Sequence, residues 1–464
     1  MQPWNLLASD TIQGFIEEAL TRKWDALQVS TALHKAGYSN EDRAAIMDYM
    51  ALVPKFREKF CSGKSANNEN ARGMFLLCDK LALEQSTAQD IGRWKANLWP
   101  RGNDATDDVT KNATDEGAKV HDLCCGMGGD SFYLPAGLKV TGVDLDENRL
   151  AMYRHNLQAF GKAAETICAD VRSIECASNG MRADYFTIDP ARRAIEGENQ
   201  RDLRNLTPTL EEVVEISRHY RGGMAKLPPS YPPAEIPDRT EILFLGGHSD
   251  CRECLVLFGE LAKHPDTVRA VIIDKNGETV AEWTRRRDRS LETLDDDLQE
   301  KLDRNDSLEG KDRTYRTATS RSDLPLGEIG KYIAEPAPVL IRSHLFNAAA
   351  LAHDPNAHLI SEGIAYVSSD KMLPAPAFTS YEILAHAEIA TGAVRSMLKE
   401  HDIGKITLKL RGVKLDPDAE TKRLKPKGKN SAILFYTRFR GEKIAILTRR
   451  CPPEPALSWP NGRA

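Results

Sequence analysis

Carboxylates at the ends of four consecutive predicted strands are the residues of this 464-residue chain most able to do chemistry. Asp122 lies in the first strand, Asp144 ends the second, Asp170 follows the third and Asp189 follows the fourth. Carboxylate oxygens accept hydrogen bonds from hydroxyl and amino groups. Because open α/β sheets bind ligands at the carboxyl ends of their strands, we expect a ligand site at this edge.

A glycine-rich turn follows the first strand, in the sequence HDLCCGMGGD that begins at His121. Glycine lets the backbone turn tightly and keeps side chains out of a ligand's way. We expect a helix after the turn, with free N–H groups, and a second strand that delivers Asp144 about 20 residues later, where nucleotide-binding units place the acid that takes two ribose hydroxyls. Glycines here often serve only the turn, and the four acidic strand ends are what favour a binding role.

Short apolar runs predict the strands that carry these residues. After the first four, we expect a fifth near Gly223 to Leu227, a sixth over Glu241–Leu245 and a seventh over Val268–Ile273, with a helix over CRECLVLFGELA between the last two. Residues 118–275 are thus predicted to form a Rossmann-like α/β domain.

The flanking segments have different patterns. Residues 1–100 predict helices, residues 101–117 a polar surface loop, and residues 281–324 a charged linker. From Thr391 a helix and three alternating strands predict a terminal α+β unit, with LDPDAETKRLKPKGKN as a flexible basic loop between the first two strands.

Charge is concentrated in this terminal unit. Residues 395–450 contain 16 Lys/Arg and 6 Asp/Glu, a local charge of +10, so the rest of the chain carries −15 of the total of −5. Such asymmetry indicates one region that meets a polyanion. A basic run is often only a solvated face, but neighbouring basic strand residues favour phosphate binding.

The quoted motifs resemble those of class I S-adenosylmethionine (SAM) dependent methyltransferases. DLCCGMGGD is similar to that family's DxxCGxGG turn, and the remaining acids stand where it keeps its ribose, adenine and acceptor motifs. More narrowly, roughly Met74 to Arg450 resembles bacterial RNA-methyltransferase-like proteins, related to cap guanine-N2 methyltransferases, that end in a THUMP-like domain. The implied fold class is α/β: a seven-stranded Rossmann-like domain with a helical N-terminal region, a small ferredoxin-like module at 325–390 and an α+β THUMP-like domain at 391–455.

The resemblance implies a role for each matching residue. The residues expected to bind the SAM cofactor are Asp122, Cys124, Gly126, Gly128, Gly129, Asp144, Leu145, Asp170 and Val171. The expected acceptor-side catalytic residues are Asp189, Pro190 and Arg192. The charge of the basic loop and of the neighbouring strands, rather than the resemblance, gives the expected RNA-binding residues, which are Arg411, Lys422, Arg423, Lys425, Lys427 and Lys429. The segment Leu83 to Ser86 resembles one that precedes the family's catalytic domain, where Glu84 and Gln85 form either a solvated helix face or a wall of the SAM pocket.

The predicted reaction is methylation of a base nitrogen, guanine or adenine, in structured tRNA or rRNA. The family's amino-methylating enzymes follow the acid with Pro-Pro-aromatic, whereas Ala191 and Arg192 follow here, so an arginine could replace the stacking ring. Carbon methylation ranks lower, since it needs a cysteine nucleophile and only Cys251 or Cys254 is placed for one. A SAM- or nucleotide-binding protein without catalysis, and a small-molecule or protein methyltransferase, remain alternatives.

Composition sets the remaining expectations. Nine irregularly spaced cysteines suggest reduced thiols, and the single CxxC, Cys251 and Cys254, lacks a second pair for zinc, so no metal is expected. The chain has no apolar run of about 18 residues or more and no signal-like start, which predicts no membrane association and a cytoplasmic location.

Overall fold

The computed structural model describes residues 4–61, 74–100, 117–173, 182–192, 206–287, 315–317 and 324–452. The chain divides into two compact units. The first is Met1–Leu245 with Glu253–Thr267 and Ile273–Thr279, and the second is Gly246–Arg252, Val268–Ile272 and Val280–Ala464. The predicted surface loop, Arg101–Gly117, lies outside the described residues except for its last residue.

The first unit begins with the predicted helices. They are α1 (Trp4–Leu7), α2 (Asp10–Thr21), α3 (Ala26–Lys35), α4 (Asn40–Met50), α5 (Val53–Cys61), α7 (Lys80–Gln85), α8 (Gln89–Lys95) and the short η1 (Ala96–Leu98). Side-chain caps fix several of them, as when Asp25 accepts from the Gln28 backbone N–H in a capping box that starts α3. Residues 74–78, predicted to be helical, are not in a helix.

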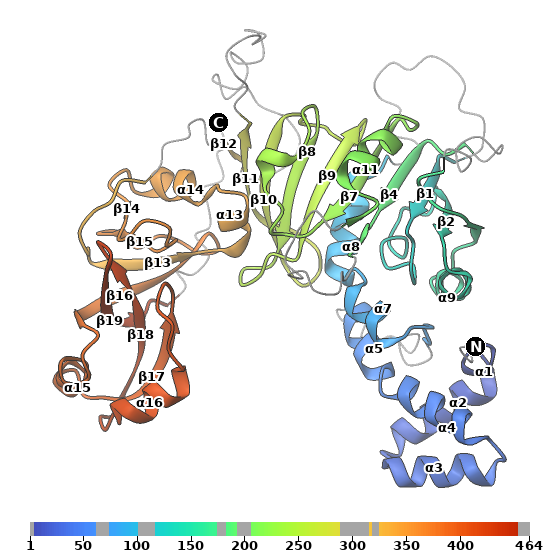
Figure 1. Ribbon diagram of the computed structural model, residues 1–464, viewed down its shortest axis with the longest axis horizontal. Coiled ribbons are helices and arrows are strands. Elements are labelled where there is room, and N and C mark those ends of the chain that lie inside the picture. The colour runs from blue at the N-terminus through green and yellow to red at the C-terminus, as the bar shows by residue number, and fades with distance from the viewer. Residues whose placement is uncertain are drawn as a thin grey trace, which may run out of the picture. The chain divides into compact units, whose positions relative to one another are not determined.

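Seven neighbouring strands form the sheet of this unit, in the order β8-β9-β7-β4-β1-β2-β3 (Figure 1). They are β1 (Lys119–Leu123), β2 (Lys139–Asp144), β3 (Ala164–Cys168), β4 (Tyr185–Ile188), β7 (Gly222–Leu227), β8 (Glu241–Gly246) and β9 (Glu253–Gly259). The five strands β1, β2, β3, β4 and β7 run parallel to one another, and β9 is antiparallel to both β7 and β8. Helices α9 (Glu147–Ala159) and α11 (Leu210–Ser217), the pair β5 (Ala191–Arg192) and β6 (Leu206–Thr207), and η2 (Pro233–Glu235) complete the unit.

Two predicted helices are absent. The segment CRECLVLFGELA was predicted to be helical, but it contains β9. β9 is therefore the seventh strand of the first unit's sheet, whereas Val268–Ile273, which was predicted to be that strand, falls in β10 (Thr267–Ile273). Every β9 residue from Glu253 to Phe258 is buried, and a continuous apolar run of this length fits a buried strand as well as a helix. No helix follows the glycine turn either, because residues 124–138 form successive turns closed by bonds such as Ser131 N–H to Gly128 O.

The second unit contains β10, β11 (Thr279–Arg286) and β12 (Tyr315–Thr317), and a seven-stranded sheet in the order β14-β15-β13-β16-β19-β18-β17. Its strands are β13 (Tyr332–Pro336), β14 (His358–Leu359), β15 (Val367–Ser369), β16 (Phe378–Glu388), β17 (Ile403–Leu410), β18 (Asn430–Phe439) and β19 (Glu442–Arg450). Its helices are α13 (Pro338–Arg342), α14 (Phe346–His353), α15 (Thr391–Glu400) and α16 (Pro417–Leu424). The predicted linker therefore begins inside β11, and most of its remainder lies outside the described residues.

Alternating side chains build a core on each face of this sheet. Leu434 and Tyr436 face α15 and α16, whereas Phe435 between them packs with Tyr366 and Tyr381 on the other face. The period of two thus places α15 and α16 against one face of the sheet. The three predicted terminal strands and the helix before them are confirmed.

Candidate functional site

The register of the parallel strands brings the predicted acids to one edge of the first unit's sheet. β1 lies between β2 and β4, with Asp122 opposite Gly142 and Thr187. Asp144 pairs with Cys168 at the end of β3. The residues that follow β3 and β4, Asp170 and Asp189, therefore leave the sheet at the same edge as Asp144.

The Cys124 thiol reports how closely these acids converge. It follows β1 directly, in a left-handed backbone conformation with φ of 55°. Burial raises the pKa of this thiol, and Asp144, Asp189, Asp122 and Asp170 each raise it further. Cys124 is therefore a neutral thiol that lies close enough to all four carboxylates for each of them to raise its pKa.

Gly126 leaves open space beside Asp144. Its φ is +52°, and a Cβ built on it meets no atom within 4 Å. Its N–H donates to Asp144 Oδ2 at 3.0 Å, while Asp144 Oδ1 accepts from the Asp146 N–H at 3.1 Å. The next residue, Leu145, is 67% exposed although it is large and apolar. An oriented carboxylate, an open turn and an uncovered apolar side chain fit the ribose and adenine of a nucleotide ligand.

Two other glycines serve packing. A Cβ on Gly142 would lie 2.6 Å from the Tyr153 ring, and one on Gly128 would lie 2.8 Å from Leu157 and 3.1 Å from Tyr153. The Tyr153 hydroxyl donates to Ser131 Oγ at 2.8 Å, and Ser131 donates to Asp122 Oδ2 at 2.6 Å. These glycines therefore admit the ring that anchors the buried Asp122.

Asp122 and Asp170 are less free than the sequence suggested. Asp122 is 3% exposed, and burial and then Asp130 raise its carboxyl pKa well above the usual range. Asp170 is held by its neighbour Arg172, whose Nε and Nη2 donate to its two oxygens at 2.9 and 2.5 Å. Val171 between them is half-buried. A ligand at Asp170 would have to share this carboxylate with Arg172.

Asp189, which the sequence predicts on the acceptor side, is part of an ion pair. Asp189 Oδ2 lies 2.7 Å from Lys226 Nζ at the end of β7, and the two side chains are 37% and 16% exposed. Burial raises the pKa of Asp189, although Lys226 opposes that shift. Burial alone would lower the pKa of Lys226, but Asp189 and Glu253 raise it by more. The pair is therefore ionised and still reaches solvent.

A buried network continues from this pair. Glu253 at the start of β9 lies 3.7 Å from Lys226 and 3.0 Å from Lys95 of α8, and Lys95 also pairs with Asp130. The Thr87 hydroxyl lies 2.8 Å from Asp130 and 2.9 Å from Glu253. The side chains of Lys95 and Glu253 are each only 4% exposed, so every charge in the network needs its partner.

Sequence reasoning missed this network. Its members are Thr87, Lys95, Asp130, Lys226 and Glu253. Lys226 at a strand end and Asp130 after the glycines were the available signals, whereas Glu253 was hidden in a segment predicted to be helical. Glu84 and Gln85 have exposed side chains, and only the Gln85 carbonyl contacts Lys226, at 3.4 Å. Pro190 is buried, and Arg192 contributes its backbone to β5.

The predicted basic loop is partly a helix. Asp416 caps α16, with Pro417 at its first position, and the helix ends at Leu424 with Lys425 in a left-handed conformation. Lys422 and Arg423 are thus on the last turn of α16, and Arg423 donates two bonds of 2.7 Å to Glu420. Arg411 donates to Ala365 O and stacks 4.7 Å from the Tyr366 ring. Both arginines are held within the fold, while Lys422, Lys425, Lys427 and Lys429 are exposed.

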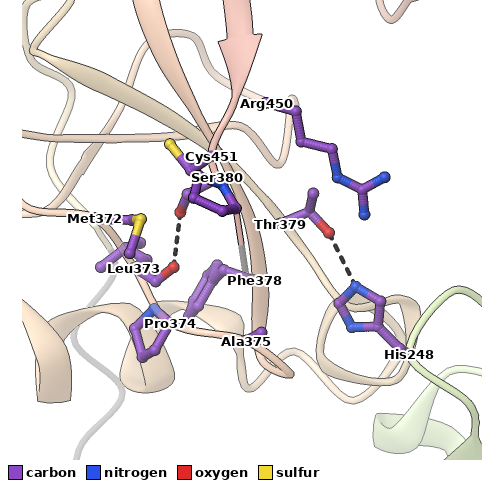
Figure 2. Close-up of a pocket in the computed structure, with 11 residues that line it drawn as sticks. His248, Met372, Leu373, Pro374, Ala375, Phe378, Thr379, Ser380, Arg450 and Cys451 are labelled. Carbon is purple, nitrogen blue, oxygen red and sulfur yellow. Dashed lines mark hydrogen bonds between the residues drawn. The ribbon is translucent and has the colours of Figure 1, made fainter. Parts of the chain in front are cut away.

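A cavity in the second unit is separate from the predicted residues. Figure 2 shows His248 bonded to Thr379 Oγ1 at 3.0 Å, and Ser380 donating to Leu373 O at 2.7 Å. The rest of the lining is mainly apolar. The His248 ring and the Ser380 hydroxyl already have partners, and none of the residues predicted to bind SAM or RNA lines this cavity.

Metal and thiol chemistry have no visible centre in the part of the chain that is described. No group of three or more His, Cys, Asp or Glu side chains converges there as metal ligands. The eight cysteines in those ranges form no disulfide bond. Among the described helices, none combines the length and apolarity that a membrane crossing needs.

Comparison with known proteins agrees with this architecture. A family model described as THUMP domain-like matches residues 378–450. Two Mycobacterium tuberculosis proteins, each named an uncharacterized S-adenosylmethionine-dependent methyltransferase, are 26% identical over 373 residues, 79% of this chain and 86% of theirs. A crystal structure from Porphyromonas gingivalis, provisionally named a methyltransferase, is 18% identical with a TM-score of 0.66 over 96% of this chain and 99% of that one.

The fold, the acidic edge and these matches agree. The seven neighbouring strands of the first unit agree with the strand count that the resemblance implies. The chain therefore has the fold of these proteins, is similar over most of its length to relatives named S-adenosylmethionine-dependent methyltransferases, and matches the THUMP-like family near its C-terminal end.

Proposed function

We propose that this methyltransferase modifies a nucleotide of structured RNA, in tRNA or rRNA. The observation that carries the proposal is the meeting, at one edge, of an open turn at Gly126 with the partly exposed ion pair of Asp189 and Lys226. One side of this edge suits a nucleotide cofactor, and the other offers charged groups to an acceptor. The THUMP-like match and the exposed lysines near α16 support RNA as the substrate.

The first half of the edge would hold SAM. Asp144 is oriented to accept the ribose hydroxyls, Leu145 offers an apolar surface to the adenine, and Gly126 leaves room for the methionine end. Asp170 would take the adenine amino group beside Arg172. When bound, SAM supplies a methyl group already activated on sulfur, so the chain's task is to position the acceptor, which is worth about 7–11 kcal/mol in favourable cases.

The second half would receive the acceptor nucleotide. Asp189 follows β4, and the exposed Ala191 and the backbone of Arg192 continue from it into β5. The sequence predicts that the acceptor atom is a base nitrogen and that Asp189, Pro190 and Arg192 lie around it.

The lysines of the second unit would contact RNA phosphates. Lys422, Lys425, Lys427 and Lys429 are exposed, whereas Arg411 and Arg423 already bond to the protein. Lysine ammonium groups bind phosphate as point charges and release counterions on contact. We therefore assign the lysines to RNA and give the two arginines a supporting role.

Three alternatives are disfavoured by specific observations. Carbon methylation needs a reactive thiolate, but burial raises the pKa of Cys251 to about 12, and Cys254 is fully buried in β9. A binding protein that has lost catalysis would not need a partly exposed ion pair supported by a buried network. A small-molecule or protein methyltransferase would leave the exposed lysines without a partner.

Labelling from SAM tests the proposal. The purified full-length protein is incubated with methyl-tritiated SAM and, separately, with total RNA, protein and metabolite fractions from a strain that lacks the gene. We expect label in tRNA or rRNA. Label only in protein or in metabolites would overturn the proposal, and so would label in no fraction.

A further inference from the structure

We propose that the acceptor atom is a hydroxyl oxygen, the 2′-hydroxyl of a ribose, and that Lys226 and Asp189 act on it together. This rests on the proposed function, namely that the substrate is RNA, and it replaces the base nitrogen expected from the sequence. The argument starts from the hydrogen-bonding chemistry of the two side chains at the acceptor half of the edge.

A hydroxyl is the nucleotide acceptor that matches both side chains. The Lys226 ammonium can only donate hydrogen bonds, and the Asp189 carboxylate can only accept them. A hydroxyl does both, so its O–H can donate to Asp189 while its oxygen accepts from Lys226. An exocyclic amino group brings only N–H donors toward the ammonium, and a ring nitrogen that accepted from Lys226 would tie up the lone pair it needs for attack.

The geometry leaves room for that exchange. Lys226 Nζ has one short contact, to Asp189 at 2.7 Å, and two long ones, to Thr87 Oγ1 at 3.3 Å and Gln85 O at 3.4 Å. Long hydrogen bonds are weak and are readily replaced by a better acceptor. Both Asp189 and Lys226 reach the surface, so an incoming oxygen can approach the pair without opening the buried network.

The surrounding charges keep Lys226 in its ammonium form. Glu253 Oε1 lies 3.7 Å from Lys226 Nζ. Lys95 forms ion pairs with Asp130 and with the other carboxylate oxygen of Glu253, Oε2, at 3.0 Å from its Nζ. A fixed ammonium at low exposure stabilises negative charge as it develops on an oxygen. Base nitrogens develop no such charge during methyl transfer, because they attack with a neutral lone pair.

Among the described side chains, the two residues that directly follow Asp189 offer no ring on which a base could stack. Pro190 is buried and Ala191 is small, so neither of the two residues after Asp189 offers an aromatic ring for stacking. Base-modifying enzymes commonly hold their target between aromatic or planar groups. A ribose needs no such platform.

The step balances with the groups present. The hydroxyl proton passes to the Asp189 carboxylate, and the ribose oxygen, stabilised by Lys226, forms the new O–C bond with the methyl group. The C–S bond breaks and its electron pair stays on the sulfur of the cofactor. Asp189 then returns the proton to water, and burial, which raises its carboxyl pKa, favours this brief protonation.

Alkaline hydrolysis of the labelled RNA is the primary test. A 2′-O-methyl group blocks cleavage of the adjacent phosphodiester, because the 2′-oxygen can no longer attack the phosphorus. We expect tritium in alkali-stable dinucleotides after the full-length protein has labelled total RNA. Tritium in base-methylated mononucleotides would overturn this inference and leave RNA methylation standing, whereas unlabelled RNA would overturn the proposed function itself.

A second test removes the acceptor. Once the labelled nucleotide is mapped, two synthetic RNA fragments are compared, one with ribose and one with 2′-deoxyribose at that nucleotide. The deoxy fragment should accept no methyl group. Equal labelling of the two fragments would exclude the hydroxyl.

Variants of Lys226 separate chemistry from folding. Lys226→Met should lower kcat about 100-fold or more, the usual effect of losing a positioned group of this kind, with the KM for RNA and the Kd for SAM nearly unchanged. Lys226→Arg keeps the charge and should recover part of the rate. Lys139→Met, at an exposed lysine where β2 begins, is the matched control and should behave as wild type. A fully active Lys226→Met protein would overturn the role of Lys226.

Discussion

The two halves of the acidic edge are built in different ways. The cofactor half uses residues close together in sequence, and its key bond, Gly126 N–H to Asp144, joins residues 18 apart. The acceptor half joins distant segments, with Lys95 and Glu253 separated by 158 residues and Thr87 and Glu253 by 166. On the proposed assignment, a local motif would bind the nucleotide cofactor, while the acceptor would meet charges that only the complete fold assembles.

The two halves also differ in how they are stabilised. Backbone N–H groups orient Asp144, whereas Asp189 is oriented by a lysine that is itself held by a buried network. Removing a charge from the acceptor half leaves its partners uncompensated, which costs more than losing one neutral hydrogen bond. Variants in the two halves should therefore separate turnover from cofactor affinity.

The largest effect should come from Asp189. Asp189→Asn keeps the shape of the side chain but removes the proton acceptor, and we expect kcat to fall by about 10²–10⁴-fold while calorimetry gives an unchanged Kd for SAM. Asp184→Asn, just before the opposite end of β4, is the control. If Asp189→Asn were active, this residue would have no role in the mechanism, and the two halves of the edge would no longer differ in their effect on turnover.

Asp144→Ala should have the opposite signature. The Gly126 N–H and the ribose hydroxyls would lose their shared partner, so SAM should bind about 1–3 kcal/mol more weakly, while kcat at saturating SAM changes little. Asp146→Ala, two residues away, should cost only helix-capping stability. SAM affinity that did not respond to Asp144→Ala would place the cofactor elsewhere.

Two neighbouring glycines sharpen the cofactor half. Gly128→Ala should lower the free energy of unfolding by about 1–3 kcal/mol, because its methyl group would meet Leu157 and Tyr153. Gly126→Ala meets no atom and should cost only about 1 kcal/mol of backbone strain, but it should weaken SAM binding by filling the open space. Thermal unfolding with and without SAM distinguishes the two; equal effects from both would contradict the division between packing and binding.

The smallest effect extends the comparison to the second unit. Replacing Lys422, Lys425 and Lys427 with alanine should weaken RNA binding and make its salt dependence shallower by about 2 in the log–log slope, at roughly 0.7 per phosphate on single strands. SAM affinity should not change. Alanine at Lys23, Lys35 and Lys55, three exposed lysines of the N-terminal helices, is the matched control. An unchanged slope would assign RNA recognition to another surface.

The sequence was sufficient for the local elements. Period-two alternation predicted the three terminal strands, and the spacing of acids and glycines predicted the edge where Asp144 and Asp189 meet. It was insufficient where local patterns are ambiguous: Leu255 to Phe258 form a run that suits a helix or a strand until both faces are seen to be covered. The network around Lys226 could not be predicted, because no periodicity relates Lys95 to Glu253.

The seven-stranded sheet of the second unit contains strands from before and from within the THUMP-like match, so the match does not mark a domain boundary. The THUMP-like match begins at Phe378, the first residue of β16, yet this strand pairs with β13 on one side and β19 on the other. The hydrophobic core beneath it mixes Ile333 and Tyr366 with Phe435 and Ile446. Cutting the chain after β16 would bare an eleven-residue strand edge and half of that core, which favours aggregation. The segment that matches the THUMP-like family is therefore not an independently folding domain. We expect residues 325–450 to fold as one cooperative unit, so truncations and domain grafts should keep that whole span.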